Sequence, residues 1–508
     1  MADVTNPRLP AEFGPRTIPA LLADRAAAHP DRTAVTGLVG GHYRTLTLSE
    51  LDTRSRRLAA GLLARGLVEP GSTLAWSLGN DRGGEALVLY HAVLRAGAVN
   101  VPLNPRLSPA EAAQLVGHSG ARVLTPGDPD GRWLAELSAE PVEDHPVTED
   151  DLAVILYTSG TTGLPKGVEH THGSALAAGI GWADCFRLTP GDVVHSPFPV
   201  FSGAGLHFNG LAALWSGAGF LVDQPDVGPT LERVARHRST VYVAVPSVYQ
   251  YWLDHDRFAD HDLTSLRVLD FGGSAMAPAV IARLRAALPG VALMQTYGFT
   301  EAGPGGTYLP EEYLPGHPGS IGNRVAGRYT AVRVLDEHDR EVGPDQPGEL
   351  VLRGPSMMRG YHNDPAATEA VLRGGWLRSG DLVRYDRDGF LYYVDRLRDL
   401  IVRGGYNIAP AEIEEALLAH PDVLEAAAFP VRHPTLGEVP AAAVVPRPGT
   451  TVTGERLRAH CATVLAGFKV PTTVSLRASL PKNAAGKVLR RVLRDQPPAD
   501  DQTSEESS

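Results

Sequence analysis

The sequence predicts an α/β protein with a large N-terminal domain of helix-covered sheets, a small β-barrel-like part and a small α+β C-terminal domain. Three observations lead to this prediction. Strand and helix patterns alternate up to about residue 310, as they do in parallel sheets covered by helices. Beyond that point the patterns change to short strands joined by turns, which favours antiparallel pairing. With 508 residues, the chain is also longer than one hydrophobic core usually supports, so we expect at least two domains.

The alternation begins near the N-terminus, where Thr17 is expected to cap the first helix. Helical patterns cover residues 19–28, 49–65, 85–96 and 108–118, and strand patterns lie within residues 68–80, 99–103, 121–124 and 153–156. Residues 125–150 are rich in Pro, Asp and Glu and are expected to form a loop. The alternation resumes after Val168.

The second half of the chain contains the predicted domain boundary. Short antiparallel strands are expected at residues 349–353, 382–385 and 390–394. A dense cluster of charges follows at residues 396–399 and marks the boundary. We therefore expect an N-terminal domain over 1–397, a C-terminal domain over 398–495 with helices at 409–419 and 454–465, and a disordered acidic tail over 496–508.

Composition excludes several classes of function. A formal net charge of −11 argues against bulk nucleic-acid binding. The two cysteines, Cys185 and Cys461, provide no disulfide framework, so we expect a reducing cytoplasm. No signal-peptide pattern opens the sequence, and no apolar run approaches the ~18 residues of a membrane span.

A loop rich in glycine and hydroxyl groups follows the apolar run Ala153–Leu156. Its glycines allow backbone N–H groups to converge on an anion, its hydroxyls add donors and its lysine adds a positive charge. This combination suits a polyphosphate, although the order of residues differs from the common P-loop. The alternative is an ordinary surface turn. The candidate phosphate ligands are Thr158, Ser159, Gly160, Thr161, Thr162 and Lys166.

A second candidate stretch, residues 295–301, follows the strand pattern at 291–294. The carboxylate of Glu301, just past a strand end and beside the Thr300 hydroxyl, is suited to hold Mg²⁺ against phosphate oxygens. Tyr297 is placed to stack on a base. The alternative is a glutamate that simply begins a helix.

Two further positions carry chemistry that is weak in isolation. Asp381, expected in a tight turn before a strand, is a suitable partner for ribose hydroxyls, with Arg396 as its support. Lys487 lies on a glycine-containing stretch near the C-terminus, where a cation can neutralise charge on a transferred group. Each of these three residues is otherwise an ordinary turn or surface residue.

Together these stretches closely resemble the superfamily of adenylate-forming enzymes, which includes acyl-CoA synthetases, peptide synthetase adenylation domains and firefly luciferase. The resemblance spans residues 17–492, keeps the motif order and is closest to acyl-CoA ligases. It implies that the loop from Thr158 to Lys166 and Thr300 bind ATP phosphates, Glu301 binds Mg²⁺ and Lys487 catalyses adenylation. It also implies that Asp381 and Arg396 hold ribose, and that adenine is enclosed by Gly273, Ser274, Ala275, Gln295, Thr296, Tyr297 and Gly298.

The resemblance further implies a two-step reaction. A carboxylic acid is activated by ATP as an acyl-adenylate with release of pyrophosphate, and a thiol then attacks the adenylate. The C-terminal domain is expected to rotate between the steps about Arg398, and Gly404 and Gly405 are expected to face the acceptor. CoA is the expected acceptor. A carrier-protein thiol, an amine or a small inorganic nucleophile such as nitrite remain alternatives, and so does a catalytically silent relative.

The acyl pocket is the region where this sequence departs from many ligases. Ser202 stands where they carry a histidine, and Ala204, His207 and Phe208 are expected to complete the pocket wall. His170 and His172 suggest a metal pair, but without a third nearby ligand a structural role is expected. The sequence does not identify the acid, and it leaves open whether the chain forms a homodimer.

Overall fold

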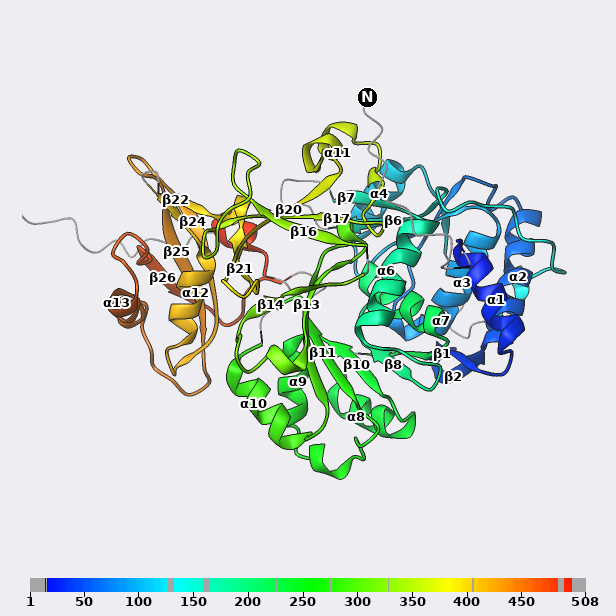
Figure 1. Cartoon of the computed structure of the whole chain (residues 1–508), viewed down its shortest axis with the longest axis horizontal. Coiled ribbons are helices and arrows are strands. Elements are labelled where there is room, and N and C mark those ends of the chain that lie inside the picture. The colour runs from blue at the N-terminus through cyan, green and yellow to red at the C-terminus, as the bar shows by residue number, and fades with distance from the viewer. Residues whose placement is uncertain are drawn as a thin grey trace, which may run out of the picture. The chain divides into compact units, whose positions relative to one another are not determined.

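The computed structural model describes residue 14 and residues 16–125, 132–158, 165–224, 226–274, 276–327, 329–403, 406–482 and 488–495. The chain divides into two compact units. Unit 1 takes in the described residues of Met1–Arg333, Val351–Ser379 and Tyr385–Tyr392. Unit 2 takes in those of Val334–Leu350, Gly380–Arg384 and Tyr393–Ser508. The elements of each unit can be followed in Figure 1.

Strands and helices alternate through the first part of unit 1. The helices are α1 (Ile18–Ala28), α2 (Leu48–Ala64), α3 (Gly83–Arg95), α4 (Pro109–Ser119) and α5 (Arg132–Leu137). The strands are β1 (Thr33–Val39), β2 (His42–Thr47), β3 (Thr73–Trp76), β4 (Val99–Pro102), β5 (Arg122–Leu124), β6 (Leu152–Thr158) and β7 (Lys166–Thr171). The alternation continues through α6 (His172–Cys185), β8 (Val193–Ser196), η3 (Ala204–Leu211), α7 (Ala212–Ser216), β9 (Gly219–Val222), α8 (Val227–Arg236), β10 (Val241–Ala244) and α9 (Pro246–Asp254).

The end of this alternation carries several candidate site residues. Its elements are η4 (Phe258–Asp260), β11 (Val268–Gly272), α10 (Pro278–Ala287), β12 (Ala292–Gly298), η5 (Thr300–Ala302), β13 (Gly306–Leu309), η6 (Glu311–Tyr313), β14 (Ser320–Gly322) and β15 (Arg324–Val325). Side-chain caps define several helix starts. Thr17 accepts a hydrogen bond from the Ala20 amide, and Thr47 forms a capping box with Glu50.

A nine-stranded sheet forms one half of unit 1, in the order β15-β13-β12-β11-β10-β8-β9-β1-β2. Strands β8 to β12 pair in parallel, as the alternation predicts. Successive residues face opposite layers. Tyr242 and Leu269 pack with α8, α9 and α10, whereas Val243 and Val268 pack with α6 and η3. Both faces of these strands are therefore buried, which explains their almost continuous apolar sequence.

A six-stranded sheet forms the other half, in the order β18-β7-β6-β4-β3-β5. Strands β3, β4, β5 and β6 are parallel. Strand β7 returns antiparallel beside β6, and β18 (Gly360–Tyr361) pairs with β7. The predicted phosphate loop therefore connects the two strands of a hairpin, whose last pair is Thr158 with Lys166.

Strands β16, β17, β20 and β21 each contribute residues to both units, whereas β14 and β19, in the same sheet, belong to unit 1. The new members are β16 (Ala331–Leu335), β17 (Gly348–Arg353), β19 (Leu372–Arg373), β20 (Trp376–Tyr385) and β21 (Leu391–Arg396), with α11 (Pro365–Val371) before β19. The expectation that Asp381 occupies a tight turn before a strand is wrong, because Asp381 lies within β20. The preceding Gly380 has φ +69°, a conformation that favours glycine and allows the backbone to bend within the strand.

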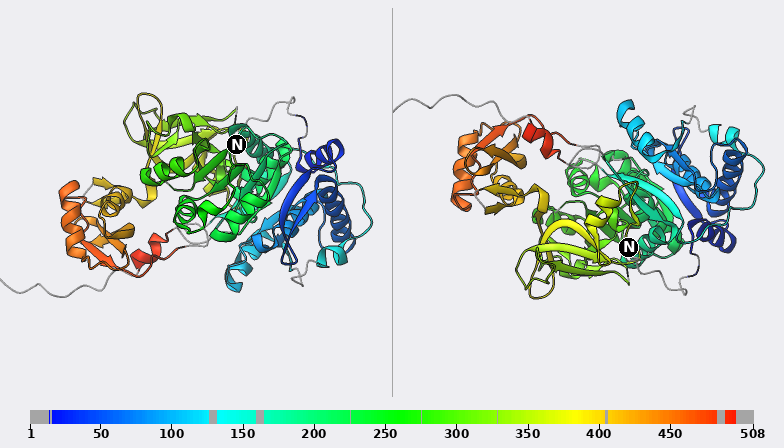
Figure 2. Two further views of the ribbon diagram at one scale, coloured as in Figure 1. Left: turned by 90° about the horizontal axis from the view of Figure 1, so that it is seen from below. Right: turned by 90° about the horizontal axis from the view of Figure 1, so that it is seen from above.

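Unit 2 also contains a small α+β region, in which helices pack on a five-stranded sheet. Its further elements are η7 (Leu397–Asp399), β22 (Ile401–Arg403), β23 (Tyr406–Ile408), α12 (Pro410–Leu418), β24 (Val423–His433), β25 (Gly437–Pro446), α13 (Gly454–Val464), β26 (Thr473–Leu476) and α14 (Arg490–Asp495). Helices α12 and α13 pack on one face of its sheet, and Leu493 of α14 packs on the other. Figure 2 shows α12 and α13 in orange tones and α14 in red.

The predicted α/β class and the predicted helices are confirmed, with one local correction. Residues 125–150, expected as a loop, contain helix α5. Trp133 is the reason, because its side chain is buried against the N-terminal core and that packing stabilises a turn of helix in a polar segment. In the described residues no helix combines the length and apolarity needed to cross a membrane. The tail at 496–508 lies outside the described residues.

Candidate active site

The base of the phosphate-loop hairpin is anchored in unit 1. Thr158 and Lys166 face each other as its last strand pair. The neighbouring Tyr157 hydroxyl lies 2.8 Å from Nδ1 of His118 and donates to the Leu115 carbonyl. Burial raises the pKa of Tyr157 to about 12, so this ring remains a neutral hydrogen-bonding anchor. The candidate ligands Ser159, Gly160, Thr161 and Thr162 lie outside the described residues.

Strand β12 ends beside the turn η5, which carries Thr300 and Glu301. The Glu301 side chain is partly exposed, and its Oε1 atom accepts a hydrogen bond of 3.0 Å from the Tyr361 hydroxyl. The Glu301 carbonyl accepts a hydrogen bond of 2.8 Å from the Met358 amide. Side chain and backbone of this candidate metal ligand are thus held by the same segment, residues 358–361.

Tyr361 connects the turn to the hairpin. The Nζ atom of Lys166 lies over the Tyr361 ring, 4.5 Å from its centre, in a cation–π contact. The hydroxyl of the same ring donates to Glu301. The pairing of Tyr361 with Val168 in strands β18 and β7 produces this placement. Sequence reasoning missed Tyr361, because a tyrosine after a glycine carries no signal of a partner sixty residues away.

The segments expected around adenine lie on neighbouring parallel strands. Gly273 and Ser274 follow β11, and Gly272 is in register with Thr296 of β12. Gln295 and Thr296 are buried, and the Thr296 hydroxyl donates to Oδ2 of Asp270 at 3.0 Å. Tyr297 and Gly298 are more exposed. The structure therefore brings these two segments together at one sheet edge, and Ala275 lies outside the described residues.

Two buried histidines contact the turn that carries Thr300 and Glu301. Nε2 of His170 lies 2.8 Å from the Thr300 carbonyl, and Nδ1 of His207 lies 3.3 Å from the Gly303 carbonyl. Burial lowers the pKa of His170 to about 4 and the pKa of His207 to about 3, so both rings are neutral at pH 7. Among the described residues, no group of three or more His, Cys, Asp or Glu is placed to hold a metal ion. Such a cluster is not needed for Mg²⁺ that is shared with phosphates.

The candidate ribose ligands meet within unit 2. Nε of Arg396 lies 2.8 Å from Oδ1 of Asp381, whose side chain is only 1% exposed. The ion pair with the arginine fixes the direction of the carboxylate. The roles assigned to this pair stay predictions.

The segment that carries Lys487 is anchored on both sides, although Lys487 itself lies outside the described residues. Lys482 and Val488 form an antiparallel bridge. After it, Arg490 forms a two-pronged ion pair with Glu414 at 2.8 and 3.0 Å. In the expected hinge, Arg398 belongs to the short helical turn η7. Gly404 and Gly405, between β22 and β23, lie outside the described residues.

Three of the four residues expected in the acyl pocket lie on η3, which is a π-helical turn. Such turns are rare and occur often at functional sites. His207 is buried, and Phe208 packs 4.3 Å from Trp182 and 5.6 Å from Phe186 between ring centres. Ala204 is partly exposed, and Ser202, just before η3, donates to the Pro199 carbonyl.

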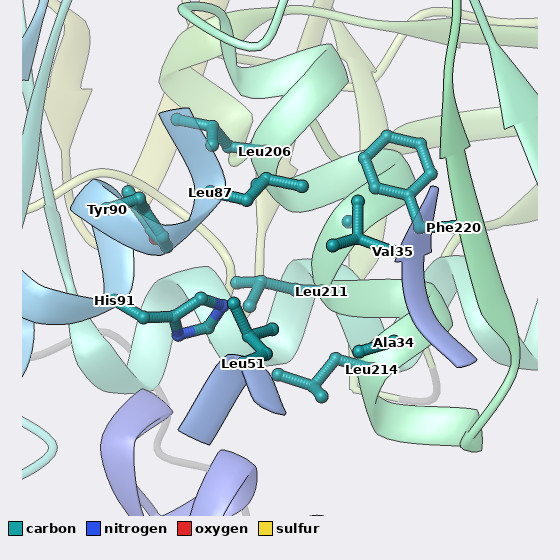
Figure 3. Close-up of a pocket in the computed structure, with 11 residues that line it drawn as sticks. Ala34, Val35, Leu51, Leu87, Tyr90, His91, Leu206, Leu211, Leu214 and Phe220 are labelled. Carbon is teal, nitrogen blue, oxygen red and sulfur yellow. The ribbon is translucent and has the colours of Figure 1, made fainter. Parts of the chain in front are cut away.

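A separate apolar cavity of about 20 Å³ lies on another side of η3 (Figure 3). Leu206 and Leu211 of η3 line it together with Tyr90 and His91 of α3. None of the four residues expected in the acyl pocket lines this cavity. Its volume is about that of one water molecule, so it is a packing defect of the core and too small for an acyl group.

The geometry has clear counterparts among known proteins. The family model "AMP-binding enzyme" matches residues 22–362, and the model "AMP-binding enzyme C-terminal domain" matches residues 412–487. Feruloyl-CoA synthase from Amycolatopsis sp. is 39% identical, over 92% of this chain and 97% of that enzyme. Oxalate–CoA ligase from Arabidopsis thaliana is 34% identical, over 94% of this chain and 98% of that enzyme.

A solved structure gives the same result for the fold. The o-succinylbenzoate CoA synthetase from Bacillus subtilis, in complex with its acyl-adenylate intermediate, superposes with a TM-score of 0.83 at 30% identity, over 94% of this chain and 98% of that one. The same enzyme is also known in complex with ATP and magnesium ion. The chain therefore belongs to the AMP-binding enzyme family and is an ATP-dependent acyl-CoA ligase that works through an acyl-adenylate.

Proposed function

We propose that this ligase activates an aromatic carboxylic acid, with ATP phosphates beside the β6–β7 hairpin, Mg²⁺ on Glu301 and CoA as the acceptor. The observation that carries the site assignment is the placement of Tyr361 between Lys166 and Glu301. It brings the Lys166 cation over the face of one ring and the Glu301 carboxylate to the hydroxyl of the same ring. A cation and a Mg²⁺ ligand that share one neighbour suit the binding of a polyphosphate.

The residues present fit Mg²⁺. This ion usually takes one or two protein carboxylates and completes its shell with phosphate oxygens and water. Glu301 supplies one partly exposed carboxylate whose orientation is set by Tyr361. Bound there, Mg²⁺ would neutralise charge on the phosphates.

The protein's own side chains have distinct tasks in the proposed adenylation. The acid's carboxylate attacks the α-phosphorus, the bond to pyrophosphate breaks, and both reactants carry negative charge. Lys487 counters that charge, and Thr300 contacts a phosphate oxygen. Asp381 and Arg396 orient the nucleotide through the ribose. The CoA thiol then attacks the acyl carbonyl, and AMP leaves.

Two observations support an aromatic acid. The π-helical turn that is expected to line the pocket places Phe208 in a cluster with Trp182 and Phe186, and aromatic side chains favour planar aromatic partners. A relative at 39% identity is a feruloyl-CoA synthase.

We also propose that the C-terminal domain begins at Arg398 and moves between the two steps, and that the enzyme works in the cytoplasm. Unit 2 starts its last segment earlier, at Tyr393, so η7 lies inside a compact unit. A three-residue turn between two strands can absorb a change in φ and ψ. The two cysteines, free in the structure, suit a reducing compartment.

The substrate proposal is tested by ATP–pyrophosphate exchange with ferulate, 4-coumarate, oxalate and palmitate, followed by CoA and mass measurement of the product. We expect exchange with the two aromatic acids and an aromatic acyl-CoA product. Exchange with oxalate or palmitate alone would contradict an aromatic acid. An adenylate that forms but transfers to an amine and not to CoA would contradict the acceptor.

The metal assignment is tested by Glu301→Gln. The amide is a poorer ligand for a hard cation than the carboxylate, yet it keeps an oxygen that can accept from Tyr361. We expect the Mg²⁺ concentration at half-maximal pyrophosphate exchange to rise about tenfold or more. Glu311→Gln, on η6 in the same unit, is the control and should leave the Mg²⁺ titration unchanged. An unchanged titration in Glu301→Gln would place the metal elsewhere.

A further inference from the structure

The backbone of the turn from Thr300 to Gly303 is held at every carbonyl. The Met358 amide donates to the Glu301 carbonyl at 2.8 Å, and the Gly305 amide donates to the Ala302 carbonyl at 2.7 Å. The carbonyls at the two ends, those of Thr300 and Gly303, are contacted by His170 and His207. Two of the four carbonyls are thus contacted by imidazole side chains from other elements, and the Thr300 carbonyl also accepts a hydrogen bond of 3.0 Å from the Gly303 amide within the turn.

The first imidazole comes from β7, the strand that begins at Lys166. Nε2 of His170 lies 2.8 Å from the Thr300 carbonyl, so this nitrogen must carry the proton and donate it. The other nitrogen, Nδ1, lies 3.2 Å from the Ser174 hydroxyl. The ring is fully buried. His170 therefore connects the hairpin strand directly to the turn 130 residues further along the chain.

The second imidazole comes from the π-helical turn η3. Nδ1 of His207 lies 3.3 Å from the Gly303 carbonyl and must donate to it. Among the described residues, Nε2 of His207 has no hydrogen-bond partner. The two imidazoles meet edge to face, with 5.5 Å between ring centres and 89° between ring planes. Each ring therefore limits the position of the other.

The end of the turn has little freedom of its own. Gly303 has φ +101°, and a Cβ atom there would collide with the Ser356 carbonyl. The turn is thus fitted closely between the 356–358 segment on one side and the histidine pair on the other. A shift of either histidine would move the backbone that carries Glu301.

We propose that His170 and His207 are positioning residues for the adenylation step, which hold the Thr300–Gly303 turn so that Glu301 presents its carboxylate to the Mg²⁺–nucleotide. The proposal rests on the metal assignment made above for Glu301. Neither histidine touches the nucleotide in this role. Each acts through one N–H donor at a defined ring position, ε for His170 and δ for His207. Burial lowers the pKa of both rings and keeps them neutral at pH 7. A neutral ring carries a proton on only one of its two nitrogens, so each histidine has one N–H donor.

The donor positions provide a matched set of variants. The amide nitrogen of glutamine occupies nearly the place of Nε2, and that of asparagine nearly the place of Nδ1. His170→Gln and His207→Asn keep the donor, whereas His170→Asn and His207→Gln misplace it with the same two residue types. His91→Gln is the control for burial, because His91 is also buried but lies on α3 beside the small cavity (Figure 3). Melting temperatures without ligand report on folding in all variants.

The measurement is calorimetric titration with ATP in the presence of Mg²⁺ and in the presence of EDTA, which requires no acid substrate. We expect the gain in ATP affinity from Mg²⁺ to fall about tenfold in the misplaced pair, His170→Asn and His207→Gln. Mutation of residues that support a metal ligand typically has an effect of this size. His170→Gln and His207→Asn, which keep the donor, and the control His91→Gln should keep the wild-type gain in ATP affinity. In ATP–pyrophosphate exchange, the misplaced pair should need more Mg²⁺.

Three outcomes would overturn the proposal, and they are distinguishable. If Glu301→Gln loses the gain from Mg²⁺ while the misplaced pair keeps it, or if all four histidine variants lose it equally, the histidines do not position the turn. If Glu301→Gln itself keeps the gain, the metal assignment fails and the positioning role fails with it.

Discussion

At the scale of single residues, two carboxylates of the candidate site are each held by a neighbour that sets their direction. Asp381 is buried beside Arg396, and Glu301 is held by Tyr361. Because these contacts fix the direction of the charged groups, the groups need little reorganisation during the reaction. Preorganised sites stabilise developing charge in this way. Lys487 is the residue whose role is best separated from the others by experiment, because it should serve one step only.

Lys487→Ala should remove most adenylation and leave thioester formation from a supplied acyl-adenylate largely intact. The loss of one preorganised charge contact costs on the order of 10²–10³ in rate. The measurement compares pyrophosphate exchange with CoA transfer from synthetic adenylate. Lys482→Ala is the control, since Lys482 lies on the same segment but pairs with Glu425 at the surface, and such pairs contribute little. Equal losses in both half-reactions of Lys487→Ala would contradict the assignment.

At the scale of elements, the short turn η7 is the expected hinge. It contains Arg398 and separates β21 from β22. Its Asp399 side chain lies 3.4 Å from Arg490 of α14. A hinge needs only a few residues that change φ and ψ, and here those residues lie between two strands whose own pairing resists such change.

Arg398→Pro should stop one half-reaction and spare the other. Proline fixes φ near −65° and removes a backbone N–H, so the C-terminal domain should be trapped in one orientation. If that orientation is the adenylating one, pyrophosphate exchange survives and transfer to CoA collapses. Arg398→Ala, which removes the side chain but not the backbone freedom, is the control. Gly405→Leu should mimic the transfer defect by crowding the path of the acceptor.

The rotating-domain account has a defined failure. Full transfer activity in both Arg398→Pro and Gly405→Leu would contradict it. A transfer defect in the hinge variant alone would favour an acceptor other than CoA.

At the scale of the whole molecule, buried neutral histidines make the folded state sensitive to acid. Burial lowers the pKa of His91 and His207 to about 3 and of His170 and His172 to about 4. The unfolded chain titrates these groups near pH 6.5. Between about pH 6.5 and 4 the unfolded state therefore binds protons that the folded state rejects, and the free energy of unfolding falls as pH falls.

Urea unfolding from pH 7 to pH 4.5 should show this loss directly. Each buried histidine contributes about 1.4 kcal/mol per pH unit below 6.5. Asp270 acts in the opposite direction, because burial raises its pKa well above the usual value. His91→Leu should make the dependence on pH less steep by one proton. A flat stability profile over this range, or an unchanged slope in His91→Leu, would show that these histidines are not neutral and buried.

Features that depend on neighbours along the chain could be predicted from the sequence. The capping residue Thr17 and the strands that precede the phosphate loop and Thr300 are all specified by short stretches, since caps and periodicity are local. The family motifs are short stretches as well, so the sequence was enough to recognise them. The roles they imply for Lys487, Arg398, Gly404 and Gly405 remain predictions.

Tertiary packing determines which residues, distant in the sequence, support the candidate site. Tyr361 and Glu301 are 60 residues apart, His207 and Gly303 are 96 apart, and His170 and Thr300 are 130 apart. Their contacts depend on the pairing of β18 with β7 and on the packing of η3 against the turn. Strand order and helix packing are settled by burial across the whole unit. A single sequence therefore carries no local signal for them, and the histidines resemble ordinary core residues until the fold places their N–H groups on the turn.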